Sequence, residues 1–160
     1  MTAHRPWPEI LRRAAVSGSL ASLASTAALL AGGVRDSGSA IAPVHAISHW
    51  VWRGRALRQD APSLRYSLVG YVIHHCASIF WAVGFESAAA LRHSPETKTR
   101  AALRAATIAA VACTVDLRCI PQRLTPGFER RLGRRSLVGV YAAFGLGLAL
   151  HALLRARLKD

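Results

Sequence analysis

Three histidines and one aspartate, all in apolar surroundings, are the side chains of this sequence best suited to chemistry. His45 and His49 stand four residues apart, a spacing that puts two side chains on one face of a helix. His74 and Asp116 each lie inside a longer apolar stretch. Imidazole and carboxylate groups together can bind a divalent metal ion, and histidines from different helices can hold a haem. The candidate metal ligands are therefore His45, His49, His74 and Asp116.

Two other interpretations of these residues stay open. Histidine and aspartate side chains inside a helical bundle can relay protons or line a path for a solute. Alternatively, the histidines hydrogen-bond to serine or backbone groups of neighbouring helices and fasten them together. We favour this structural interpretation, because the spacing matches no known metal-binding motif. For Asp116 it predicts an ion pair with Arg118 or with another arginine at the end of a helix.

Helical periodicity indicates which face of the segment around His74 points into a bundle. Small and polar residues recur there at every fourth position: Gly70, His74, Ser78, Ala82 and Glu86. His75 shares its face with larger apolar residues, so His74 is the better candidate for the interior.

Two further sets of residues are expected to act in helix packing. Glu86 and Arg104 stand near facing ends of consecutive apolar stretches, which predicts a structural ion pair. Gly139, Ala143 and Gly147 recur every four residues and would form a stripe of small side chains that lets another helix approach closely. Small residues recur in the first apolar stretch as well. These stripes predict association with a second copy of the chain or with a larger membrane partner.

Long apolar segments must position all of these candidates. A hydrocarbon core about 30 Å thick needs roughly 20 predominantly apolar residues in a helix. Four segments are of this kind, and none alternates apolar and polar residues as a membrane β-strand would: residues 14–34, 66–91, 101–120 and 136–154. We predict an all-α transmembrane helical bundle that forms a single integral membrane domain over residues 1–160.

A further apolar segment, residues 38–52, is shorter. Its 15 residues would span about 22 Å as a helix, less than a comfortable crossing. It could be a thin or tilted span, a re-entrant piece, or a helix at the interface with Trp50 and Trp52 among the lipid headgroups. The arginines favour a fifth crossing by a narrow margin. The first, second and fourth long segments have their more basic flank before them, whereas the third has it behind.

The charge of the chain narrows the class of protein. Its 21 Lys and Arg outnumber 8 Asp and Glu, which gives a net charge of +13. A nucleic-acid-binding protein could carry this charge, but rarely four long apolar segments as well, and these segments also exclude a disordered chain. Arg5, Arg12 and Arg13 place the N-terminal side of the first segment in the cytoplasm. Residues 125–135 fit either a short basic helix on anionic lipid headgroups or a charged loop.

The N-terminal arginines and the three cysteines each allow one further interpretation. Arg12 and Arg13 before an apolar stretch also fit a cleavable export signal, although the later segments would still hold the chain in the membrane. The three cysteines Cys76, Cys113 and Cys119 form no CxxC pair, and we expect them to be buried free thiols.

The strings APVHAISHW, GYVIHHCASIFWAVGFE and DLRCIPQRLTPGFE resemble segments of small polytopic bacterial inner-membrane proteins to which no activity is assigned. The resemblance implies the inner membrane as the location and brings no cofactor or catalytic residue. The sequence contains no P-loop, GxSxG or HExxH motif. We therefore expect a non-enzymatic structural or accessory component of that membrane. The alternatives are a metal- or haem-binding component and a small transporter or proton path.

Overall fold

The computed structural model describes residues 7–91 and 96–157, so Arg5 of the charge argument lies outside the described residues. Every regular element in these two ranges is a helix. In chain order the elements are α1 (Trp7–Ser37), α2 (Ala42–Ile47), α3 (His49–Trp52), the 3-10 helix η1 (Arg53–Arg58), α4 (Leu64–Ala90), α5 (Lys98–Thr114), the π-helix η2 (Val115–Cys119), the 3-10 helix η3 (Phe128–Arg130) and α6 (Arg134–Arg157).

Three helices of the described chain are long and apolar enough to cross a membrane, namely α1, α4 and α6. They contain the predicted segments 14–34 and 136–154 and nearly all of 66–91, so these three predictions are confirmed. The predicted segment 101–120 is also helical through α5 and η2, but α5 has only 17 residues and is not among the three.

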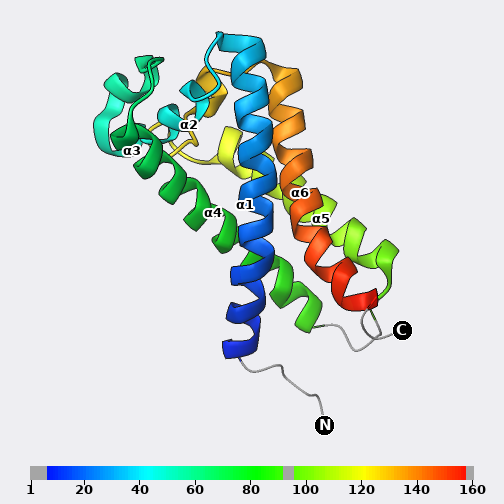
Figure 1. Cartoon of the computed structure of the whole chain (residues 1–160). Helices are drawn as coiled ribbons and strands as arrows, with labels where there is room; N and C mark the ends of the chain where they lie inside the picture. Colours follow the sequence, from blue (N-terminus) through cyan, green and yellow to red (C-terminus); the bar gives the residue numbers. More distant parts are fainter. Residues whose placement is uncertain (1–6, 92–95, 158–160) are drawn as a thin grey trace.

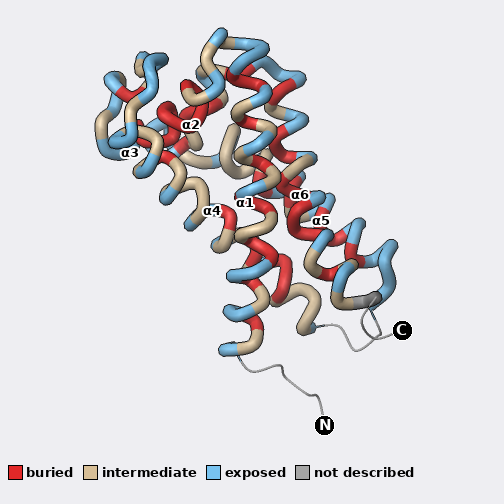
Figure 2. The backbone as a smooth tube through the Cα atoms, in the orientation of Figure 1, coloured by how far each residue is buried: buried red, intermediate tan, exposed pale blue. Residues whose placement is uncertain are grey.

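The long helices run alternately between the two ends of the molecule (Figure 1). α1 leads away from the end where the chain begins, α4 returns, α5 leads away again and α6 returns. α1 packs against both α4 and α6, and α6 packs against α5 on its other side. Figure 2 shows the buried residues gathered along the middle of α1 and α6 and along α2. Large apolar side chains also face outward, Phe80, Val138 and Leu146 among them, as expected of helices surrounded by lipid.

Small residues set the closest contacts between helices. A Cβ atom added to Gly147 of α6 would overlap the backbone of Ala21 in α1, and one added to Gly18 would lie 2.7 Å from the Cα atom of Ile79 in α4. Gly147 therefore lies at a close contact between α6 and α1. Ala143 is half-buried, whereas Gly139 is exposed, and a Cβ there would meet no described atom within 4 Å. Gly139 packs on no described helix of the chain, because the stripe turns away from α1 toward the start of α6.

The segment 38–63 does not cross the molecule. The Ser39 hydroxyl donates a hydrogen bond of 2.8 Å to the carbonyl oxygen of Asp60, so the two ends of the segment meet at the same end of the bundle (Figure 1). The six residues of α2 are all buried, and a Cβ added to Gly70 of α4 would overlap the Val44 carbonyl oxygen. The predicted fifth crossing is wrong, because differences of a single arginine do not outweigh this packing. The segment instead folds back on itself, with α2 buried at this end of the bundle.

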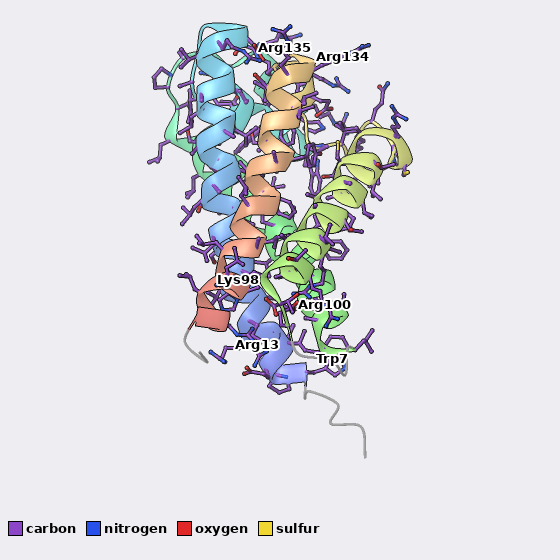
Figure 3. All side chains as sticks on the ribbon, turned by 90° about the vertical axis from the view of Figure 1, so that its right-hand side faces the viewer. Trp7, Arg13, Lys98, Arg100, Arg134 and Arg135 are labelled. Carbon is purple, nitrogen blue, oxygen red and sulfur yellow. The ribbon has the colours of Figure 1, made fainter. Side chains whose placement is uncertain are left out.

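Charged groups tie the connections together at this end. Arg35 bonds to the Ser136 hydroxyl at 2.7 Å, and Asp36 accepts a hydrogen bond of 2.8 Å from the Gly133 amide. Figure 3 shows Arg134 and Arg135 at this end, while Arg13, Lys98 and Arg100 lie toward the other. The bundle therefore has a basic rim at both ends and an apolar middle.

Candidate functional site

A cavity of about 600 Å³ lies between α4 and the α5–η2 helix. Its inner wall is formed by Val140, Tyr141 and Phe144 of α6, and residues around Leu124 and Phe128 close it at the end where α2 and α3 lie. His74 and Asp116, two of the predicted site residues, both contribute to its wall. This cavity is therefore the place where the structure brings candidate residues together.

Asp116 reaches the cavity from the π-helix η2. A π-turn adds a residue to the helical turn and so changes the direction of the side chains that follow, and such turns are frequent at functional sites. The Tyr141 hydroxyl donates a hydrogen bond of 3.1 Å to Asp116 Oδ2. Within residues 7–91 and 96–157, no ion pair involves Asp116. The predicted pair with Arg118 is wrong, because the side chain of Asp116 faces α6 whereas Arg118 is exposed.

His74 joins α4 to α1. Its Nε2 atom lies 2.9 Å from the Ser25 hydroxyl oxygen. The Ser25 hydroxyl already donates to the Ala21 carbonyl at 2.7 Å, so His74 must donate through Nε2–H and Ser25 must accept. The ring is thereby held in one tautomer, as a fastening between two helices.

His45 and His49 lie at the end of the bundle and face different neighbours. His45 donates from Nδ1 to the Gln59 carbonyl at 3.0 Å, and its Nε2 accepts from the Ser67 hydroxyl at 2.8 Å. His49 donates from Nδ1 to the Ala46 carbonyl at 3.0 Å, while its buried Nε2 has no partner among the described residues. The two rings do not share a face, because the helix is interrupted at Ser48, between α2 and α3.

The predicted metal set is not assembled. In the described part of the chain, no three His, Cys, Asp or Glu side chains are grouped so that they could hold a metal ion. His45 has both ring nitrogens occupied, His74 bonds to α1, and Asp116 bonds to α6. The spacing of His45 and His49 predicts a common face only when one helix contains both residues, but His45 lies in α2 and His49 in α3.

The ion pair predicted between Glu86 and Arg104 is also wrong. Glu86 is buried and meets two side chains of α6, His151 Nδ1 at 3.4 Å and an Arg155 nitrogen at 3.8 Å. Arg104 pairs with Glu96 at 2.5 Å and lies 4.3 Å above the centre of the Phe85 ring. The two residues find different partners because α6, packed between α1 and α5, presents its basic last turns to Glu86.

Sequence reasoning singled out Trp50, but only for the membrane interface, and it assigned no role to Tyr141, which lies within the apolar segment 136–154. A tyrosine hydroxyl in such an apolar segment usually forms a hydrogen bond to a polar group of another segment, and this is the signal that could have identified Tyr141. The three cysteines are free, as predicted, but Cys76 and Cys119 are exposed rather than buried, and Cys76 lines the cavity.

No protein-family model, curated protein or solved structure matches this chain. Its function must therefore be inferred from its own residues and their geometry.

Proposed function

We propose that this protein is a non-enzymatic, multi-pass structural or accessory component of the bacterial inner membrane. The observation that supports this role is that polar side chains inside the apolar helices hydrogen-bond to polar side chains of neighbouring helices. They bond in pairs between helices: His74 with Ser25, Glu86 with His151, and Tyr141 with Asp116. Such pairs fasten helices where lipid offers no polar alternative.

The proposal includes a fourth crossing by α5 and η2. The 17 residues of α5 and the five of η2 follow one another without a break and would together reach about 33 Å at 1.5 Å per residue. Lys98 and Arg100 stand at one end of this unit and Arg118 at the other, as expected of a span with basic flanks. The charge of Arg104 is countered by Glu96 near the first end. Four crossings would place the two long connections at one membrane surface, where their arginines could bind anionic lipid headgroups.

The histidine that bridges α4 and α1 provides a test. Replacing His74 by Leu should lower the free energy of unfolding in detergent by about 0.5–1.7 kcal/mol, the range measured for hydrogen bonds between membrane helices. His75→Leu on the neighbouring position is the matched control, because His75 Nδ1 has no partner among the described residues. In the double variant with Ser25→Ala, the loss should be smaller than the sum of the single losses.

The same samples distinguish this role from the alternatives. Purified wild-type protein should come from the inner-membrane fraction, require detergent and contain no stoichiometric metal or haem by elemental analysis and absorption spectroscopy. A metal or a haem spectrum that disappears with His74→Leu would overturn the structural role of His74. Recovery in the soluble fraction would overturn the membrane location.

A small transporter or proton path is the second candidate, and one observation favours it. His74 and Asp116 contribute to the wall of the same cavity, and intramembrane histidine and carboxylate groups often carry protons. Proteoliposomes would then show a proton flux that His74→Ala or Asp116→Asn reduces. Equal flux in wild-type and variant liposomes would exclude this path.

A further inference from the structure

The cavity between α4 and η2 concentrates the aromatic residues of the chain. The sequence has 4 Trp, 3 Tyr and 4 Phe, and six of these residues line the cavity: Trp50, Phe80, Trp81, Phe128, Tyr141 and Phe144. Most of the other lining side chains are aliphatic. The faces of aromatic rings carry partial negative charge and attract organic cations.

Negative charge is also left without a counterion beside these rings. Asp116 is the one acidic residue among the described residues that line the cavity, and it forms no ion pair with any of them. Glu129 is the next residue in the chain after Phe128 of the cavity wall. Glu129 meets Arg130 only at 3.9 Å, and its Oε2 atom is buried without a partner in the described part of the chain. An uncompensated carboxylate in apolar surroundings is costly, and a bound cation would remove that cost.

The cavity can be reached from the side of the bundle. Four of the α4 residues that line it are exposed, namely Val72, Cys76, Ala77 and Phe80. These residues lie in a helix that is apolar enough to cross the membrane, so this opening faces the hydrocarbon layer rather than water. A ligand that enters here must have an apolar body. The volume of the cavity, about 600 Å³, is within the range of small-molecule sites, roughly 300–1,000 Å³.

We propose that this cavity binds a lipophilic organic cation, with its apolar body among the aromatic rings and its positive charge next to Asp116. An ammonium or phosphonium compound with large apolar substituents has the required chemistry. Tyr141 orients the carboxylate through its hydrogen bond to Oδ2 and is a positioning residue. This binding activity goes beyond the accessory role, and its lipid-facing entrance rests on the membrane crossings of the proposed function.

Equilibrium dialysis of tetraphenylphosphonium against the purified full chain in lipid nanodiscs tests the proposal. The wild-type protein should bind the cation saturably. Asp116→Asn keeps the shape of the side chain and an acceptor for Tyr141 but removes the charge, so it should weaken binding at least about tenfold. Glu9→Gln, which removes a carboxylate at the far end of α1, should leave binding unchanged. Absence of saturable binding to wild type, or equal binding to Asp116→Asn, would overturn the proposal.

A second pair of variants keeps the carboxylate and blocks the space. Ala77 is exposed at the cavity wall, so Ala77→Trp should fill the opening without disturbing the core and should reduce cation binding. Leu146→Trp on the outward face of α6 is the matched control and should bind as wild type does. The neutral dye N-phenyl-1-naphthylamine should bind equally to wild type and Asp116→Asn. If the dye lost affinity together with the cation in Asp116→Asn, the loss would come from a change in the cavity itself and not from the missing charge, which would contradict the proposed charge recognition.

Discussion

At the scale of single residues, hydrogen bonds decide what each intramembrane ionisable group does. His45 has partners for both ring nitrogens, and the Ser25 hydroxyl fixes the tautomer of His74. The His45 ring therefore cannot bind a metal without breaking a bond that holds two segments together. The residues that attract attention as ligands therefore have another use, one that becomes visible only when their partners are known.

Glu86 allows a direct prediction at this scale. Its carboxylate is buried and lies between His151 and Arg155, so its removal breaks both of these contacts between α4 and α6. We expect Glu86→Ala to lower the free energy of unfolding in detergent by about 3–5 kcal/mol, as for other broken buried pairs. Chemical or thermal unfolding followed by circular dichroism measures this loss. Glu9→Gln, in an exposed ion pair with Arg12, should change stability by less than about 1 kcal/mol. A Glu86→Ala protein as stable as that control would show that the pairing with α6 contributes nothing.

The sequence predicted the residues on one helix better than their partners on another. The face of α4 that carries Gly70, Ser78, Ala82 and Glu86 is buried, as its four-residue spacing predicted. Periodicity contains this information because it reports the direction of side chains along a single helix. It contains none about which helix comes opposite, and the wrong partner for Glu86 follows from that.

At the scale of elements, close approach depends on residues without side chains, and α6 offers a matched comparison. Gly147 touches the backbone of Ala21, whereas the position of a Cβ at Gly139 is open. Gly147→Ala should therefore separate α1 from α6 and cost about 1–3 kcal/mol. Gly139→Ala should be neutral or stabilising by up to about 1 kcal/mol, because alanine is the better helix former. Thermal unfolding of the two variants in the same detergent gives the comparison, and equal stabilities would contradict the packing of α1 on α6.

The elements were predictable where length and hydropathy alone define them. α1, α4 and α6 are long apolar stretches and were found from the sequence, whereas the helix over 101–120 is interrupted by Arg104 and Asp116 and ends in a π-turn. The buried position of α2 depends on contacts with α4 and η3, which are distant in the chain. No local sequence pattern contains information about such contacts. The interruption of the helix at Ser48 and the cavity between α4 and η2 could therefore be found only from the structure.

At the scale of the whole molecule, the return of segment 38–63 to its own starting end fixes the number of crossings. Ser39 bonds to Asp60, so exposed residues on either side of α2 lie at one end of the bundle. With α5 as a crossing, the first residues of α1 and those at the start of α5 lie at the opposite end. A topology with five crossings would instead separate the two ends of segment 38–63. The two arrangements therefore differ in the membrane side of a few exposed residues.

Cysteine labelling in intact cells distinguishes these topologies. In a variant without Cys76, Cys113 and Cys119, single cysteines would replace exposed residues in the connections or near the starts of α1 and α5: Arg12, Ala40, Ala61, Thr99 and Gln122. A membrane-impermeant maleimide should label the cysteines at 40, 61 and 122 from one side, and those at 12 and 99 only from the other. Labelling of the cysteines at positions 40 and 61 from opposite sides would show that segment 38–63 crosses the membrane. Labelling of 99 and 122 from the same side would remove α5 from the spans, and with it the lipid-facing entrance to the cavity.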